Sequence, residues 1–140
     1  MQNFFDLYTG DTEIIKSVEN SIPINLLEND NKFSMIVGSN KSGKTSLAKS
    51  YSMLNQANLI FDIPKSLKNL KKTYLDLNSL NLADENLFHF LEYFISQDIG
   101  LTIFTSTDPL NVDENQAIIA DIKSRLSLFN IARIENPNDE

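Results

Sequence analysis

Short apolar runs alternate with amphipathic segments along most of the chain, and polar or glycine-containing turns separate them. The apolar runs predict five β-strands, at residues 32–37, 58–63, 73–77, 101–105 and 130–134. Apolar positions three and four residues apart predict helices at 45–54, between Asp84 and Gly100, and at 118–126. Strands that alternate with helices predict a parallel sheet that helices cover on both faces.

Other segments have a weaker pattern. Residues 12–27 predict a helix that Thr12 caps, with Pro23 at its end or in its final turn. Residues 66–72 are basic and predict one or two helical turns, and Gly100 is expected to close the helix that begins after Asp84. Residues 1–11 are aromatic and short, and we expect an N-terminal arm there, followed by a single domain at 12–140.

The first predicted strand leads directly into a segment that fits the phosphate-loop pattern G-x-x-x-x-G-K-[ST] at every position. Glycines let the backbone amides of such a loop point at one phosphate, and the following helix adds its free N–H groups and positive dipole end. Lys44 would reach the β- and γ-phosphates, and the Thr45 hydroxyl would ligate Mg²⁺. A strand before and a helix after favour this interpretation over a turn without function. The predicted nucleotide contacts are Gly38, Ser39, Asn40, Lys41, Ser42, Gly43, Lys44, Thr45 and Ser46.

A magnesium ion bound beside such a loop needs a carboxylate at the end of a neighbouring strand. Asp62 and Asp76 each end a predicted strand. We favour Asp76, together with Thr45, because the strand directly after the loop helix is often an edge strand in this type of fold, and we expect Asp62 to be a turn residue. Leu77 and Asn78 follow where a second acid would orient the attacking water, so fast hydrolysis is not expected.

Polar side chains at the end of the 101–105 strand are further candidates. Thr105 and Thr107 would face the terminal phosphate there, while ordinary turn chemistry before Pro109 explains them equally well. The chain contains ten lysines but only two arginines, Arg125 and Arg133. Because lysine supplies most of the positive surface charge, we consider a specific role for each arginine. Arg125 could reach a phosphate on a neighbouring subunit, although, taken alone, a surface salt bridge is the simpler interpretation.

The composition is that of an ordinary globular domain. The 140 residues are 41% hydrophobic and 22% charged, which suffices for one domain with a core. No apolar run is long enough for a membrane span and no signal-peptide pattern opens the chain, so we expect a cytoplasmic protein without membrane contact. The lack of cysteine excludes disulfides and zinc–thiolate sites. A net charge of −7 argues against binding of nucleic acid by the bulk surface, and the single His89 fits a helix surface better than a catalytic role.

Three stretches together resemble the AAA+ ATPases of the DnaA/Hda family, and the similarity runs from about Lys32 to Glu140. The first is the phosphate loop itself. The second, 83–91 leading into 101–109, is similar to the family's acidic-start helix, its sensor 1 strand and a T-S-x-x-P turn. The third, Asp121-Ile122-Lys123-Ser124-Arg125-Leu126, is similar to the family's D-L-x-S-R-[LF] box, and the end of the chain resembles its last strand and the entry to its lid.

The resemblance implies a P-loop NTPase of the AAA+ type: a three-layer α/β sandwich with a five-stranded parallel sheet. It implies ATP or ADP with Mg²⁺ as ligands, Thr105 and Thr107 as the sensor 1 region, and Arg125 as an arginine finger. It implies a regulator of chromosomal replication initiation that presents Arg125 to DnaA on the sliding clamp. Such a protein would be a weak ATPase or would activate its partner's ATPase; whether it forms a homo-oligomer is left open.

The N-terminus carries a second resemblance. Gln2 to Leu7 is similar to the hexapeptide Q-x-x-L-x-[LF] by which Hda-type proteins dock on the sliding clamp. Gln2 would form hydrogen bonds while Phe5 and Leu7 fill an apolar pocket; a plain arm is the alternative. The chain ends at Glu140, where the family's helical lid would begin, so we expect neither a lid nor a sensor 2 arginine. A helix-turn-helix domain is also missing, so we expect no direct sequence-specific binding of DNA.

Two other functions fit parts of the sequence. A small P-loop nucleotide kinase would have this size, but it needs an arginine-rich lid, and two arginines are too few. A degenerate module that only binds nucleotide or a partner agrees with the absence of a second acid after Asp76.

Overall fold

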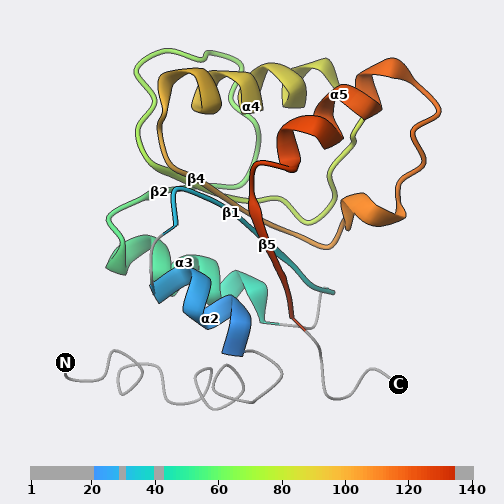
Figure 1. Cartoon of the computed structure of the whole chain (residues 1–140). Coiled ribbons are helices and arrows are strands. Elements are labelled where there is room, and N and C mark those ends of the chain that lie inside the picture. Colours follow the sequence, from blue (N-terminus) through green and yellow to red (C-terminus); the bar gives the residue numbers. More distant parts are fainter. Residues whose placement is uncertain (1–20, 29–30, 40–42, 135–140) are drawn as a thin grey trace.

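One parallel sheet of five strands forms the centre of the molecule (Figure 1). The computed structural model describes residues 21–28, 31–39 and 43–134. The strands are β1 (Phe33–Val37), β2 (Asn58–Ile60), β3 (Thr73–Asp76), β4 (Leu101–Thr105) and β5 (Asn130–Arg133). Their spatial order is β2-β3-β4-β1-β5, and every neighbouring pair is parallel. The strand after the loop helix, β2, is indeed an edge strand, and β3 lies closer to β1.

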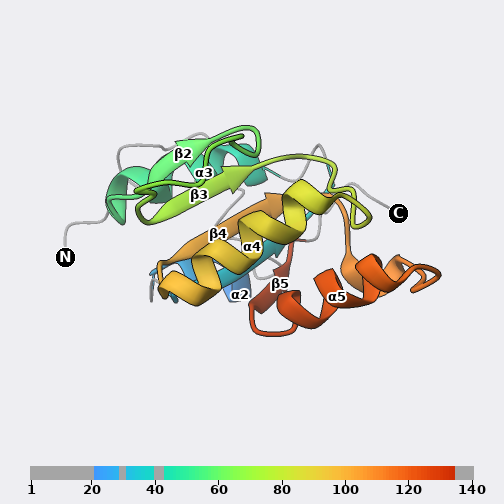
Figure 2. The same ribbon diagram turned by 90° about the horizontal axis from the view of Figure 1, so that it is seen from above.

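Helices cover the sheet on both faces, so the predicted three-layer sandwich is confirmed (Figures 1 and 2). One face carries α2 (Ser21–Glu28) and α3 (Lys44–Leu54). The opposite face carries α4 (Glu85–Gln97) and α5 (Ala117–Leu126), which lie against each other. A 3-10 helix, η3 (Pro109–Asn111), follows β4. Among the described residues, no helix has both the length and the apolar character that a membrane crossing requires.

Each central strand is buried on both sides, which explains its continuous apolar run. In β1, Met35 and Val37 join the core under α4 and α5, while Ile36 joins the core under α2 and α3. Tyr74 and Phe104 accompany Ile36 on the second face with ring centroids 5.4 Å apart. This two-sided burial fixes the register of the strands, because a slip by one residue would exchange the two cores.

Pro23 corrects one prediction. The sequence predicts that Pro23 ends a helix or lies in its final turn, but in the structure it is the third residue of α2, which continues to Glu28. A proline in a first turn costs no hydrogen bond, because the amide groups there have no partner within the helix. Residues 12–20, with the proposed cap Thr12, lie outside the described residues.

The segment between β2 and β3 corrects a second prediction. Residues 66–72 contain no helical turn, although one or two turns are predicted for this short basic segment. Asn69 has φ +54°, a left-handed conformation that a continuing right-handed helix cannot accept. At the end of α4 it is Asp98, with φ +58°, that forms the left-handed cap, and not Gly100 as predicted.

Candidate phosphate-binding site

The turn from β1 into α3 begins and ends at a glycine. The Gly38 amide donates a 2.9 Å hydrogen bond to the carbonyl of Thr105, which ties the end of β1 to the end of β4. Gly43 is the N-cap of α3 and has φ +86°. A Cβ atom would find open space at Gly43, so its backbone conformation, which favours glycine, is the reason for this residue. Residues 40–42 lie outside the described part.

Lys44 lies inside this turn. Its side chain is only 3% exposed, and its Nζ donates a 3.0 Å hydrogen bond to the carbonyl of Ser39. Burial lowers the pKa of Lys44, while the negative charge of Asp76 opposes that shift. A buried ammonium group that is held by only one described carbonyl retains donors for an anion at this position.

The first turn of α3 provides further donors. Gly43 has no side chain that could cap the helix, and the first turn contains no acidic residue that would oppose an anion. Thr45 is exposed and Ser46 is half-buried, so hydroxyl groups line the same turn. The free amide groups, the dipole of an 11-residue helix and the Lys44 ammonium together form an arrangement that can hold a phosphate group.

The two candidate carboxylates occupy different surroundings. Asp76 is half-buried at the carboxyl end of β3 and is close enough to influence the pKa of Lys44. Asp62 is exposed beyond edge strand β2, and its carboxylate accepts a 2.9 Å hydrogen bond from the Ile63 amide, as expected for a turn residue. Within the described part of the chain, no group of three or more His, Cys, Asp or Glu could hold a metal. A Mg²⁺ ion at Thr45 and Asp76 would therefore complete its shell with phosphate and water oxygens, which is its usual preference.

The side chains of Thr105 and Thr107 form hydrogen bonds with the loop that follows β3. The buried Thr105 hydroxyl donates to the carbonyl of Asn78 at 2.9 Å and accepts from the Thr107 amide at 3.2 Å. The Thr107 hydroxyl accepts from the Leu80 amide at 3.0 Å. No local pattern indicates these bonds, because they join residues about 27 positions apart. Their effect is to fix the loop after Asp76 to the end of β4.

Both arginines are ion-paired, Arg125 on the layer of α4 and α5 and Arg133 beside the end of β1. Arg125, near the end of α5, places its Nε 2.8 Å from Oε1 of Glu92 on α4, and its guanidinium lies 4.5 Å from the ring centroid of Phe88. Arg133 binds Asp108 in a bidentate manner, with distances of 2.6 and 2.8 Å. Sequence reasoning missed Glu92 and Phe88 as partners of Arg125. The candidate residues Gln2, Phe5 and Leu7 lie outside the described residues.

Comparisons with known proteins were made at the level of sequence and of structure. No protein-family model and no curated protein matches the sequence. The structure is similar to that of DnaI, with a TM-score of 0.66 and 14% identity over 89% of this chain and 94% of that one. It is similar to a primosome component, described as putative, from Streptococcus pyogenes serotype M3, with a TM-score of 0.60 and 15% identity over 90% and 85% of the two chains.

A third neighbour is larger. AMPPCP-bound DnaA from Aquifex aeolicus gives a TM-score of 0.57 and 16% identity over 86% of this chain, which spans 46% of that one. At such identities these likenesses establish the fold. The chain shares the α/β fold of these proteins, and its five-stranded parallel sheet between two helical layers agrees with the fold that the sequence predicts.

Proposed function

We propose that this chain binds an adenine nucleotide, ATP or ADP, with Mg²⁺ and regulates the initiation of chromosomal replication in the manner of the DnaA/Hda family. The observation that carries the nucleotide part is the turn between Gly38 and Thr45, where a left-handed Gly43 precedes a buried Lys44. The similar fold of AMPPCP-bound DnaA supports the same ligand class. The nucleotide contacts are assigned to Gly38–Ser46 and the magnesium ligands to Thr45 and Asp76.

The ligand is proposed to serve mainly as a switch. The Thr105 hydroxyl, completely buried and bonded to the Asn78 carbonyl, supports the structure of the loop and has no exposed surface toward a phosphate. Asn78 itself cannot accept a proton as a carboxylate does. Both features favour slow turnover or none, so a nucleotide-binding module without catalysis is the second candidate function. The two arginines are engaged in ion pairs, which gives a kinase mechanism no support.

Arg125 is proposed to act on a partner, with DnaA as the candidate. It lies on the face of α4 and α5, away from its own loop on α3, as a residue that acts in another subunit should. Its side chain is 28% exposed, so the guanidinium is partly accessible while Glu92 and Phe88 orient it. A guanidinium that is pre-oriented loses less freedom when it binds a phosphate.

Two measurements test this function. Nucleotide affinity with and without Mg²⁺ is compared between the wild type and Asp76→Asn; the metal should strengthen binding of the wild type several-fold and bring little gain to the variant. Turnover of DnaA-bound ATP, with clamp on DNA, is compared between the wild type and Arg125→Ala. Equal turnover in both would exclude the proposed role of Arg125 as an arginine finger. The nucleotide-binding module without catalysis would then be the remaining candidate function.

Docking on the sliding clamp through Gln2, Phe5 and Leu7 is a separate part of the proposal. A pull-down with the clamp should lose binding when Gln2→Ala and Phe5→Ala are combined. Retention of binding by the double variant would exclude this motif without affecting the nucleotide site.

A further inference from the structure

Apart from the phosphate-loop segment at 38–49, positive charge is concentrated in one further segment of this acidic chain. Residues 61–72, which we call the basic strap, contain four lysines and one aspartate, a net charge of +3. The whole chain carries −7, so the remaining residues carry −10. Such asymmetry makes the strap a part of the surface that attracts acidic groups.

The strap is held in place by its apolar residues and presents its lysines to solvent. Leu67 and Leu70 pack against the core under α4, and the Leu70 amide donates a 3.2 Å hydrogen bond to the hydroxyl of Tyr93 on α4. Among the strap's lysines, Lys65, Lys68 and Lys71 are exposed, and their side chains form no ion pair or hydrogen bond within the described structure. Phe61 at the start of the strap is 56% exposed.

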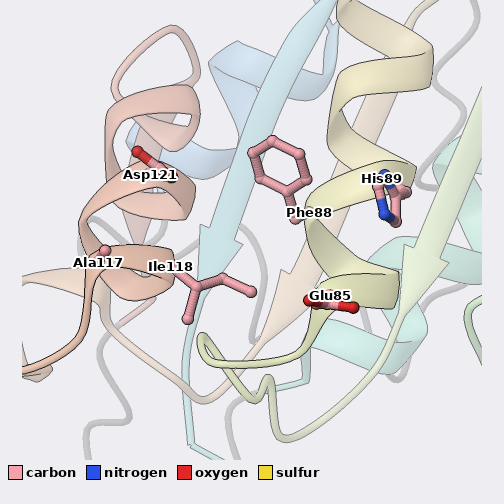
Figure 3. A pocket seen from close by; sticks show the side chains of 6 residues that line it. All are labelled: Glu85, Phe88, His89, Ala117, Ile118 and Asp121. Carbon is pink, nitrogen blue, oxygen red and sulfur yellow. The ribbon is translucent and has the colours of Figure 1, made fainter.

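An acidic groove lies on the same helical layer. It has a volume of about 350 Å³ between the first turns of α4 and α5. Figure 3 shows Phe88 and Ile118 between the two helices, with Glu85 from α4 and Asp121 from α5 beside them. Both carboxylates are exposed, and neither has an ion pair in the described part of the chain. His89 and Ala117 complete the lining. An apolar floor with two unpaired carboxylates fits a basic segment that also carries an apolar side chain.

The strap and the groove lie on opposite sides of α4. Figures 1 and 2 both place the 61–72 segment beside α4, with α5 on the other side of that helix. Between them, the exposed residues Asn86 and Ser96 of α4 are uncharged, and the partly exposed Glu92 carboxylate is paired with Arg125. Two patches on one face exchange places when a two-fold axis runs along the face between them.

We propose that a second copy of this chain occupies the groove, in a symmetric dimer that pairs α4 with its counterpart. The basic strap of each copy lies against the carboxylates of Glu85 and Asp121 of the other, so each dimer contains two equivalent strap–groove contacts. The surface of α4 between the two patches, where Glu92 is paired with Arg125, lies at the axis, so no unpaired charge of this surface meets its own copy. A stable dimer of standard size buries about 800 Å² on each partner, roughly a tenth of the 7933 Å² surface of this chain.

Charge reversal with mixing tests this arrangement. The strap variant combines Lys65→Glu, Lys68→Glu and Lys71→Glu, and the groove variant combines Glu85→Lys and Asp121→Lys. Sedimentation over a concentration series at about 0.05 M salt, where screening is weak, should show a wild-type dimer that dissociates as salt is raised. Each variant alone should be monomeric, because both of its contacts then join like charges. An equimolar mixture should form the dimer again, since both contacts of the mixed dimer join opposite charges.

All substituted side chains are exposed, so the variants should retain the wild-type circular dichroism. If the strap variant nevertheless fails to fold, the neutral pair Glu85→Gln and Asp121→Asn should still weaken the dimer at least tenfold. A wild type that remains monomeric at low salt overturns the proposal. A mixture of the two folded variants that remains monomeric also overturns it. So does a result in which only the strap variant or only the groove variant loses the dimer.

Discussion

The Nε atom of Arg125 lies 2.8 Å from a carboxylate oxygen of Glu92, and this ion pair joins α5 to α4. The guanidinium also covers the ring of Phe88 at 4.5 Å, and one of its terminal nitrogens donates to the Asp121 carbonyl at 3.1 Å. Arg125 therefore contributes to the packing of this helical layer whether or not it also acts on a partner.

Replacement of Arg125 should reduce stability for this reason. We expect Arg125→Ala to lower the free energy of unfolding by about 1 kcal/mol, since a partly exposed ion pair and a cation–π contact are both lost. Urea unfolding measures the difference. Ser124→Ala, an exposed neighbour on the same helix, serves as the control and should change little. Unchanged stability of Arg125→Ala would show that the contacts with Glu92 and Phe88 contribute nothing in solution.

The bond between Thr105 and Asn78 gives a second prediction. Thr105→Val removes the hydroxyl that supports the loop after β3, and we expect a loss of about 1 kcal/mol because the bonds of this buried hydroxyl to the Asn78 carbonyl and from the Thr107 amide are both lost. Thr105→Ser should retain most of the wild-type stability. If the two variants are equally stable, the hydroxyl is not the supporting group.

The buried Tyr51 should make the stability of the fold sensitive to alkali. Its side chain is completely buried, and burial together with the neighbouring Glu28 raises its pKa well above the ordinary value. Since the folded state keeps the phenol protonated, its contribution is complete below about pH 10 and is lost as the pH rises further. The free energy of unfolding should fall above that pH in the wild type and fall less in Tyr51→Phe. Parallel pH profiles for the two proteins would contradict this.

The pair of Asp108 and Arg133 should make the stability of the fold sensitive to acid. The Arg133 guanidinium lowers the pKa of the Asp108 carboxyl, so the pair stabilises the fold above about pH 4 and is lost as the pH falls. Asp108→Asn should cost about 1 kcal/mol at neutral pH, and its difference from the wild type should disappear toward pH 3. Asp113→Asn, at an exposed position, is the control. A difference that is constant from pH 7 to about pH 3 would exclude the ion pair as the cause.

Much of the fold could be predicted from the sequence because its signals are local. The buried runs of β1 and β4 and the spacing of Leu87, Leu91 and Phe94 on α4 each follow from the surroundings of a short segment. The helical prediction for 66–72 was wrong because its basic composition does not determine its conformation, and Leu67 and Leu70 pack from an irregular backbone. Its conformation depends on α4, and no local pattern contains that information.

The candidate site likewise has a part that could be predicted from the sequence and a part that could not. The glycines, Lys44 and Thr45 could be predicted because a phosphate loop is a continuous segment with fixed spacing. The preference for Asp76 over Asp62 followed from a rule of topology, and the strand order agrees with that rule. The bonds of Thr105 and the partners of Arg125 could not be predicted, because each depends on two elements that only the tertiary structure brings together.

The most direct test of the central claim is calorimetric titration with ATP and with ADP, in the presence of Mg²⁺, of the wild type, Lys44→Ala and Lys49→Ala. Both lysines lie on α3, but Lys44 is buried in the turn and Lys49 is exposed. Circular dichroism confirms that each variant is folded. We predict that the wild type and Lys49→Ala bind nucleotide alike, while Lys44→Ala binds at least about tenfold more weakly, a loss of about 1.4 kcal/mol or more. A wild type that binds neither nucleotide, or a folded Lys44→Ala that binds as tightly as the wild type, would contradict the account.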